Sequence, residues 1–306
     1  MSYIFLEKIG YYKTKAAIKH HFFCKRLVKE DLKRKQDTLA AIDALPAGLL
    51  PLRSSDKPEV VVSLTSYGIR AKESLPCTLY SLMTQTHMPD RIVVWLDNIH
   101  FSDPALTPPL RRLKEVGIEF NYVEDIRSYK KLIPALKKYP DDIIITVDDD
   151  WYYNPKTVEW LLDDYVRSDK QTVLGTWGYR PNFSDGEFTP YSTWSIEDGT
   201  EREDVSLIGC GGILYPPHVF DEEILKADLF TRLAPTADDL WFWVMEKRLG
   251  IKSRLSTIHG YGLHTAIDRI SIYEPNTPGS LYFINEVNGQ NDIQLRKLIE
   301  YYRIEP

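Results

Sequence analysis

The fold is decided by one stretch of the sequence, which reads Asp141-Asp142-Ile143-Ile144-Ile145-Thr146-Val147-Asp148-Asp149-Asp150-Trp151. A short β-branched run lies here between a Pro-Asp-Asp turn signal and three carboxylates. Its length, branching and turn signal favour a buried strand over a helix. We expect Val147 to be the last buried residue, with Asp148, Asp149 and Asp150 at the carboxyl end of the strand. In open α/β sheets, ligands bind at that edge.

These three aspartates, residues 148–150, are called the acidic triplet below. Adjacent carboxylates repel one another, and a hard cation relieves that repulsion. Mg²⁺ and Mn²⁺ suit carboxylate oxygens, and Mg²⁺ takes one or two of them and completes its shell with water and substrate phosphates. The triplet could instead be a solvated acidic turn. The strand before it and the aromatic residues Trp151, Tyr152 and Tyr153 after it favour a site for a metal ion and a diphosphate.

Length and composition are those of a globular α/β protein. The chain has 306 residues, of which 43% are hydrophobic, so it can form a substantial core. Its three cysteines, Cys24, Cys77 and Cys210, are far apart, which predicts neither a disulfide framework nor a zinc site and fits a reducing compartment. We find no signal peptide and no apolar run long enough to span a membrane, so we expect a cytoplasmic protein.

Charge is distributed unevenly along the chain. Residues 1–36 carry ten Lys and Arg against three Asp and Glu, a formal charge of +7, which leaves −13 for the rest. The acidic remainder argues against a nucleic-acid-binding core. Residues 3–45 have the blocks of apolar residues and lysines of a basic amphipathic helix. This helix either lies on an anionic membrane, on the inner face of the cell membrane, or packs on the body with its lysines outward.

Strands and helices are predicted to alternate after a linker at residues 46–58, which implies a mostly parallel sheet covered on both faces. We expect strands at 59–67, 91–98, 118–123, 143–147, 173–179 and 206–215. We expect helices at 75–83, 104–116, 130–139, 156–165, 238–249 and 293–302. Thr236 is the predicted cap of the helix at 238–249.

The order of these elements resembles that of the GT-A-fold nucleotide-sugar glycosyltransferases. The resemblance is to the broad family-2-like group, with similarity to exostosin-type transferase domains. It rests on the first strand ending Leu-Thr-Ser-Tyr, the second ending Val-Val-Trp-Leu-Asp-Asn, the acidic triplet, the Gly211-Gly212 strand and the pair Asp238-Asp239 opening a helix. It covers residues 59–265. The Gln-x-x-Arg-Trp motif of processive family-2 synthases is absent, which argues against a processive polymerase.

The resemblance implies a GT-A-like, Rossmann-like α/β fold with two parts. Residues 1–57 would form an N-terminal helical extension and linker, and residues 58–306 the transferase domain. Within that domain, residues 58–170 would be the nucleotide-binding half and 171–306 the acceptor half.

The resemblance also implies roles for single residues on the donor side. Asp150 would bind Mn²⁺ or Mg²⁺, Asp148 would contact the ribose or a metal-bound water, and Asp149 could do either. The remaining candidates for the nucleotide and its diphosphate are Thr65, Tyr67, Arg70, Asp97, Arg127 and Lys131. For Thr65 and Tyr67 the alternative is ordinary polarity at a strand end, and for the lysine a solvated helix face.

On the acceptor side the resemblance points to the acidic pair, residues 238–239. Asp239 would deprotonate the acceptor hydroxyl and Asp238 would orient the sugars, although acidic residues at a helix start are also common as caps. Gly211 and Gly212 would let a sugar ring approach the backbone. His264 is a candidate for a further metal ligand, with a buried hydrogen-bonded histidine as the alternative. The candidates for stacking on sugars are Trp177, Trp194, Trp241 and Trp243.

The sequence therefore predicts a metal-dependent glycosyltransferase with a UDP-type donor and a glycan or lipid-linked acceptor. The resemblance suggests a place in bacterial surface polysaccharide synthesis. One alternative is a sugar-1-phosphate nucleotidyltransferase, although the loop at residues 65–70 has one glycine where that class has a glycine-rich loop. A second is a phosphatase with an aspartate nucleophile, but that chemistry needs Asp-x-Asp after the first core strand, whereas here several elements come before the triplet. A third is a non-catalytic glycan-binding module, against which the two intact acidic motifs argue.

Overall fold

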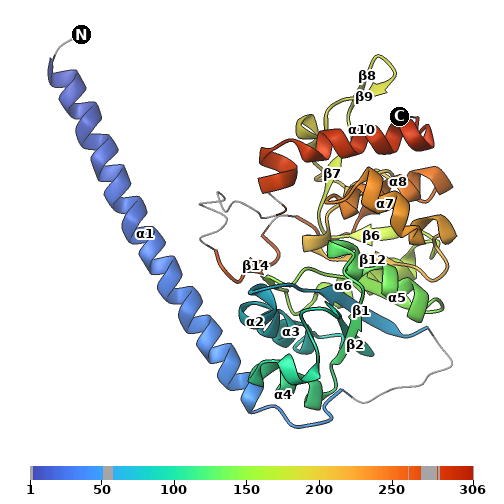
Figure 1. The fold of residues 1–306 in the computed structure, drawn as a ribbon. Helices are drawn as coiled ribbons and strands as arrows, with labels where there is room; N and C mark the ends of the chain where they lie inside the picture. Colours follow the sequence, from blue (N-terminus) through green and yellow to red (C-terminus); the bar gives the residue numbers. More distant parts are fainter. Residues whose placement is uncertain (1–2, 51–57, 261, 270–280, 282, 306) are drawn as a thin grey trace.

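The computed structural model describes residues 3–50, 58–260, 262–269, 281 and 283–305. Its centre is a seven-stranded sheet in the order β13-β6-β12-β4-β1-β2-β3 (Figure 1). β12 is antiparallel to both of its neighbours, and the other pairings are parallel. The predicted α/β fold with a mostly parallel sheet is confirmed. The strands are β1 (Val60–Thr65), β2 (Arg91–Asp97), β3 (Glu119–Val123), β4 (Ile143–Thr146), β6 (Val173–Gly175), β12 (Ile213–Tyr215) and β13 (Ser253–Leu255).

Helices cover both faces of this sheet. Successive side chains of a strand point to opposite faces, so Val61 packs in one core cluster and Val60 and Val62 in the other. The first cluster includes residues of α5 (Ile133–Lys138), α7 (Ala227–Leu233), α8 (Asp238–Leu249) and α10 (Gln290–Tyr302). The second includes residues of α2 (Arg70–Glu73), α3 (Leu75–Met83), α4 (Pro108–Val116) and α6 (Thr157–Arg167).

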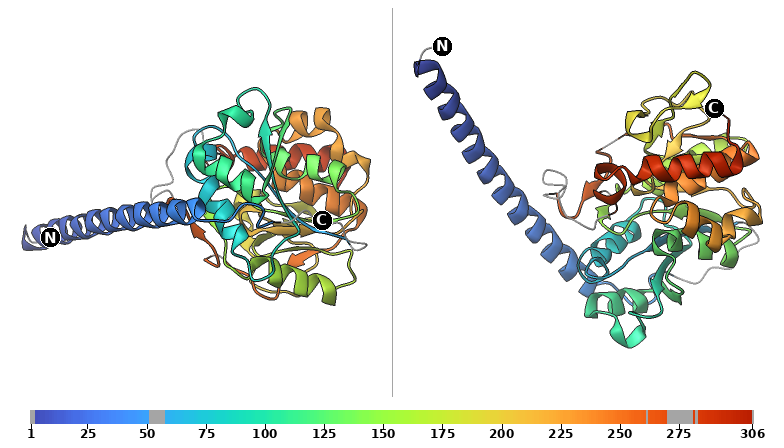
Figure 2. Two further views of the ribbon diagram at one scale, coloured as in Figure 1. Left: turned by 90° about the horizontal axis from the view of Figure 1, so that it is seen from below. Right: turned by 45° about the horizontal axis from the view of Figure 1, so that its top comes forward.

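The predicted N-terminal helix is confirmed as α1 (Tyr3–Asp43). Figures 1 and 2 show that it extends away from the body and meets it near α3 and α4. Ile42 and Leu50 are buried in the second core cluster, so the end of α1 and part of the predicted linker are built into the body. Residues 51–57 of that linker lie outside the described residues. Among the described helices, none is long and apolar enough to cross a membrane.

Some predicted elements are broken in the structure. The strand expected at 206–215 is interrupted by a 3₁₀ turn, Gly209–Gly211, between β11 (Ser206–Leu207) and β12. The segment 173–179 divides into β6 and β7 (Gly178–Arg180). The helix expected at 130–139 begins as a 3₁₀ turn, Arg127–Lys131, and Thr236 does not cap α8, because its hydroxyl bonds Asn285 and Gln294 instead.

The remaining elements are short and lie in the connections. The strands are β5 (Trp151–Tyr152), β8 (Phe183–Ser184), β9 (Glu187–Phe188), β10 (Ser195–Ile196) and β14 (Thr265–Ala266). Further 3₁₀ turns lie at Asp103–Ala105, Tyr191–Thr193 and Glu222–Leu225, and a π-helical turn lies at Phe283–Val287.

The sheet itself points to the place where a ligand would bind. The chain runs from β1 outward through β2 and β3 and then returns to β4 on the other side of β1. Between β1 and β4 the strand order therefore reverses, and in open α/β sheets ligands bind at the carboxyl ends of the strands at such a point. The segment after β1 and the acidic triplet after β4 both emerge at this edge of the sheet. Because β12 is antiparallel, the glycines before it reach the same edge.

Candidate active site

One half of the site is organised by Arg70, the first residue of α2. Its guanidinium lies 3.2 Å from Asp149 Oδ1 and 2.9 Å from Asp150 Oδ2. Asp149 also accepts a hydrogen bond from the Ser66 hydroxyl. Asp149 is only 4% exposed, so the prediction that Val147 is the last buried residue of this stretch is wrong. Burial of the middle carboxylate is possible because a guanidinium and a hydroxyl replace its water.

The other half of the site is organised by Lys131, which is buried. Its ammonium lies 3.0 Å from Asp238 Oδ2, 3.2 Å from Asp148 Oδ1 and 3.4 Å from Asp239 Oδ1. One cation thus joins the acidic triplet to the acidic pair at the start of α8. Gly209 makes room for it, because any side chain there would collide with the Lys131 ammonium. Asp239 in turn accepts a hydrogen bond from the Gly209 N–H at 3.1 Å.

Within the acidic pair, the two carboxylates have different surroundings. Asp238 is buried against Lys131, whereas the Asp239 side chain keeps 25% of its surface exposed. Asp239 is therefore the member of the pair that solvent reaches more readily. Asp238 is turned toward Lys131, so this arrangement does not support the predicted contact of Asp238 with sugars.

Negative charge exceeds positive charge in this site. Two cations face five carboxylates, which leaves a charge of −3 when all of them are ionised. Burial raises the pKa of Asp150 to about 7 against the opposing effect of Arg70. Burial likewise raises the pKa of Asp239 to about 7 against the opposing effect of Lys131. Burial lowers the pKa of Lys131, but the surrounding carboxylates outweigh it and raise this pKa overall.

The donor set fits one kind of metal site. Among the described residues, no group of three or more His, Cys, Asp or Glu side chains could hold a metal ion by itself. Asp148 and Asp150 are 34% and 32% exposed, and their oxygens are hard donors in a region of excess negative charge. Such a pair suits Mg²⁺ or Mn²⁺, because Mg²⁺ usually keeps several waters and binds one or two carboxylates together with substrate phosphates.

His264 lies near this region but does not present a free nitrogen. Its Nδ1 accepts a hydrogen bond from the Asn154 N–H at 3.2 Å, so its Nε2 carries the proton and donates to the Gly211 carbonyl at 2.9 Å. Burial lowers the pKa of His264 to about 4, which fits this neutral form. The structure therefore does not support His264 as a metal ligand and agrees with the alternative of a buried, hydrogen-bonded histidine.

Gly211 and Gly212 are constrained by the backbone around them. A Cβ on Gly211 would lie 2.9 Å from Thr176 Oγ1, and Gly212 has a φ of +89°. Gly211 is thus required by local packing and Gly212 by its backbone conformation, which are local structural reasons for both glycines. Gly211 also lines a small cavity whose other described neighbours are Trp151, Thr176, Trp177, Cys210, Gly260, Gly262 and His264.

Two nucleotide candidates lie at strand ends and are held by local bonds. The Thr65 hydroxyl donates to the Trp95 carbonyl at 2.8 Å. Asp97 Oδ1 accepts from the His100 N–H at 2.7 Å and from His100 Nδ1 at 2.8 Å, so Asp97 stabilises the turn after β2. These contacts favour a local structural role for both residues.

The remaining nucleotide candidates are Tyr67, which follows β1, and Arg127, which begins the 3₁₀ turn before α5. The Tyr67 side chain is exposed, and the Arg70 guanidinium lies 5.6 Å from its ring. Arg127 has a positive φ of 57°, and its guanidinium bonds the Pro235 carbonyl at 3.2 Å. Tyr67 therefore borders the half of the site organised by Arg70, whereas Arg127 ties the loop before Lys131 to the loop before α8.

The tryptophan prediction is mostly wrong. Trp241 and Trp243 are fully buried in α8, and Trp194 packs on Trp243 with ring centroids 5.2 Å apart. Trp177 alone of the four candidates lines the small cavity. Sequence reasoning also missed Tyr153, whose hydroxyl accepts from the Asp148 N–H at 2.8 Å and donates to the Cys210 carbonyl at 3.1 Å. Its place in the aromatic run that follows the acidic triplet was the available signal.

No family model and no curated protein sequence matches this chain. Among solved structures, glucosyl-3-phosphoglycerate synthase from Mycobacterium tuberculosis in complex with Mn²⁺, UDP and glucosyl-3-phosphoglycerate is 12% identical, with a TM-score of 0.46 over 81% of each chain. CMP:2-keto-3-deoxy-manno-octonic acid synthetase complexed with CTP is 13% identical, with a TM-score of 0.44 over 77% of this chain and 100% of its own. TarS from S. aureus is 17% identical, with a TM-score of 0.41 over 81% of this chain and 73% of its own. Likeness at this level does not transfer an activity.

Proposed function

We propose that this protein is a metal-dependent glycosyltransferase that moves a sugar from a nucleoside-diphosphate donor, expected to be UDP, to a glycan or lipid-linked acceptor. The observation that carries the proposal is the position of Lys131 between the acidic triplet and the acidic pair. Through Lys131, the metal-ligand candidates of the acidic triplet and the Asp239 carboxylate, whose pKa is raised, lie together at the carboxyl ends of β1 and β4. The same proposal divides the chain into a helical extension and linker, residues 1–57, and a transferase domain, residues 58–306. It also includes a role in bacterial surface polysaccharide synthesis.

Charge in the donor half suits a metal–diphosphate pair. Asp148 and Asp150 would hold Mn²⁺ or Mg²⁺, which when bound would stabilise the charge that develops on the leaving diphosphate. Arg70 lies beside Asp150 and would donate hydrogen bonds to diphosphate oxygens. Asp149, held by Ser66 and Arg70, would fix the loop that carries Arg70.

Asp239 is the candidate general base for an inverting reaction. The bond from the anomeric carbon to the diphosphate oxygen would break, a bond from the acceptor oxygen to that carbon would form, and the hydroxyl proton would pass to Asp239. A base works best when its pKa is close to the working pH, and burial raises the pKa of Asp239 to about 7. Asp238 would act by positioning Lys131 beside it.

The proposal is tested by separating donor binding from transfer. We expect wild-type protein to bind UDP in a Mn²⁺-dependent manner in calorimetry and to hydrolyse or transfer one sugar from a panel of UDP-sugars. Asp239→Asn should keep UDP binding within about twofold and lower turnover by at least about a hundredfold, as expected for a lost general base. Asp228→Asn, on the exposed side of α7, is the matched control and should keep both.

The alternatives give different products in the same assay. A sugar-1-phosphate nucleotidyltransferase would release pyrophosphate from a nucleoside triphosphate, and a glycan-binding module would turn over neither substrate. The proposal is wrong if pyrophosphate release is the only activity, or if no UDP-sugar is bound or hydrolysed in the presence of Mn²⁺.

A further inference from the structure

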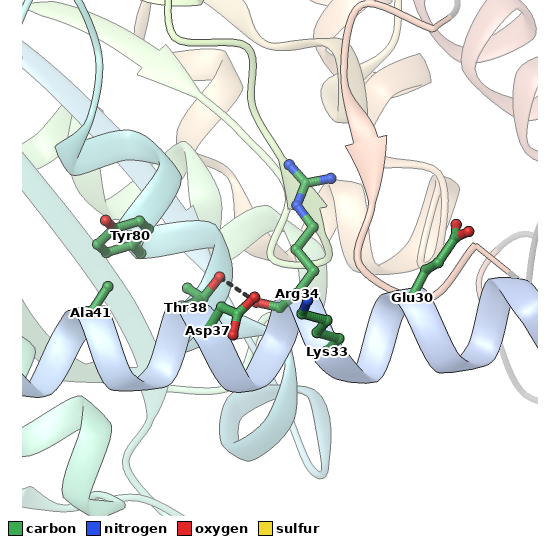
Figure 3. Close-up of a pocket in the computed structure, with 7 residues that line it drawn as sticks. All are labelled: Glu30, Lys33, Arg34, Asp37, Thr38, Ala41 and Tyr80. Atoms are coloured by element: carbon green, nitrogen blue, oxygen red, sulfur yellow. Dashed lines mark hydrogen bonds between the residues drawn. The ribbon is translucent and has the colours of Figure 1, made fainter.

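α1 has a side that faces the body and a side that faces away from it. Leu27, Thr38 and Ile42 are buried, and the Arg34 guanidinium lies 3.8 Å from the centre of the Tyr152 ring. Figure 3 shows Arg34 reaching from α1 toward the body. An open groove of about 380 Å³ runs along this side of the helix. Its lining residues are Glu30, Lys33, Arg34, Asp37, Thr38, Ala41 and Tyr80.

An ion pair fixes the rotation of α1 about its axis. Asp31 accepts from the Arg269 backbone N–H at 3.0 Å and pairs with the Arg269 guanidinium, which also lies 3.0 Å from Glu30. Because these acidic residues face the body, the opposite side of the helix is held outward.

Three exposed lysines form a row along α1, in which Lys25 and Lys29 lie on the outward side and Lys33 lies at the edge of the groove that it also lines. Lys25, Lys29 and Lys33 are four residues apart, a spacing that places side chains on one face of a helix. Lys29 and Thr38 are separated by about two and a half turns and so point to opposite sides. The three lysines are exposed, and none forms an ion pair with any residue in the described part of the chain.

Apolar side chains accompany this row. Leu32 and Val28 are four residues apart beside the lysines, and they are 56% and 42% exposed. A face that combines uncompensated lysines with exposed aliphatic side chains has the composition of helices that lie in the interface of an anionic membrane. We call the set Lys25, Val28, Lys29, Leu32 and Lys33 the basic face.

We propose that the basic face binds an anionic lipid surface. Lysines on the face would be attracted to the negative surface potential, and Leu32 and Val28 would enter the boundary between headgroups and acyl chains. Figures 1 and 2 show that α1 continues beyond the body on the N-terminal side of the basic face. A second copy of the chain is a poorer partner for this face, because two rows of lysines would repel each other.

The test uses the full chain and vesicles without any nucleotide sugar, so it is independent of the proposed activity. We expect wild-type protein to co-sediment with phosphatidylcholine vesicles that contain phosphatidylglycerol, and not with pure phosphatidylcholine vesicles. Binding should weaken as salt is raised. The triple variant Lys25→Gln, Lys29→Gln and Lys33→Gln should bind at least about tenfold more weakly. Glutamine is also a good helix former, so α1 should persist, as circular dichroism would verify.

A control with the same change of charge separates the face from net charge. Lys137, Lys156 and Lys297 are exposed on the body, and replacing all three by Gln should leave vesicle binding within about twofold of wild type. Leu32→Gln should weaken binding without changing the charge. The proposal is overturned if the α1 variant binds as wild type does, if both triple variants lose binding equally, or if the α1 variant alters only self-association in sedimentation velocity.

Discussion

Asp150 is the residue on which the donor half of the site depends most. Its carboxylate already has a partner, since Arg70 lies 2.9 Å away, yet the neighbouring Asp148 and Asp149 leave the region with excess negative charge. A divalent ion would offset this excess more fully than one guanidinium does, and it would leave Arg70 available to a diphosphate. We therefore expect the carboxylates that pair with Arg70 in the free protein to bind the metal ion when it is present.

Replacing Asp150 by Asn tests its role with little change of shape. The amide loses the negative charge that attracts the metal ion, so we expect Mn²⁺-dependent UDP affinity to fall by more than about tenfold, or about 1.4 kcal/mol. Calorimetry with and without Mn²⁺ measures the change. Asp185→Asn, in an exposed turn whose φ of 53° suits Asn, should bind UDP as wild type does. Unchanged Mn²⁺ dependence in Asp150→Asn would remove this residue from the metal site.

Lys131 is expected to matter for stability as well as for the site. Lys131→Met keeps much of the side-chain volume but leaves three carboxylates without their shared cation, and breaking such a buried ion pair costs about 3–5 kcal/mol. Urea unfolding at pH 8 measures the loss. The loss should be smaller at pH 5, because Asp239 can then take up a proton.

The neighbouring Lys130 provides the matched control. It is also buried, but its partner Asp125 is 46% exposed and can be solvated by water once the cation is gone. Lys130→Met should therefore cost less than Lys131→Met. Equal losses in the two variants would mean that the carboxylate cluster does not depend on Lys131.

At the scale of elements, the sequence was most informative where periodicity repeats. The β-branched runs at β1, β2 and β4 identified buried strands, and the lysine-rich apolar pattern identified α1. It failed where tertiary contacts decide the backbone. In the turn Gly209–Gly211, a Cβ on Gly209 would meet Lys131 and one on Gly211 would meet Thr176, and these neighbours are distant in sequence.

The same distinction applies to the candidate site. The acidic triplet and acidic pair could be selected from the sequence because each is a local cluster. Their connection through Lys131 joins segments about a hundred residues apart, which no local pattern reveals. Ser66 was missed for the same reason, since it lies 83 residues from Asp149, whereas the contact of Tyr153 with Asp148 is local.

α8 contains a buried carboxyl group that gives a pH-dependent prediction. Glu246 is buried, its Oε2 has no hydrogen-bond partner among the described residues, and burial raises its pKa from 4.5 to about 8. The folded protein therefore keeps a proton that the unfolded chain releases above pH 4.5. Stability from this group is full below pH 4.5 and is lost as the pH rises toward 8.

Glu246→Gln should remove this dependence, because the amide stays neutral. Relative to wild type, the variant should become more stable as the pH rises from 5 to 8, by at most about 1.4 kcal/mol per pH unit. Urea unfolding at several pH values measures it. Glu300→Gln, on the exposed side of α10, should follow the wild-type curve. Parallel curves for wild type and Glu246→Gln would show that the Glu246 carboxyl group is already ionised in the folded protein.

At the scale of the whole molecule, the packing of α1 raises an alternative to the proposed division at residues 57 and 58, namely a boundary inside α1. The sequence placed the division at residues 57 and 58, after the linker. In the structure the second half of α1 packs on α3 and α4, whereas its beginning extends away from the body in Figures 1 and 2. Among the side chains of this segment that the structure describes, the buried ones run from Leu27 to Ile42 and Leu50. The stable unit is therefore expected to include residues 27–50.

Truncation and core substitution together locate this boundary. Removing residues 1–24 should leave the free energy of unfolding within about 0.5 kcal/mol, because no buried residue is lost within the described part of this segment. Ile42→Ala should lower that free energy by about 2–5 kcal/mol, since the side chain is fully buried and a cavity would remain. Leu32→Ala, on the outward side of the same helix, should change it by less than about 0.5 kcal/mol. If Ile42→Ala is as stable as Leu32→Ala, α1 is not part of the cooperative unit, and the division after the linker describes the molecule better.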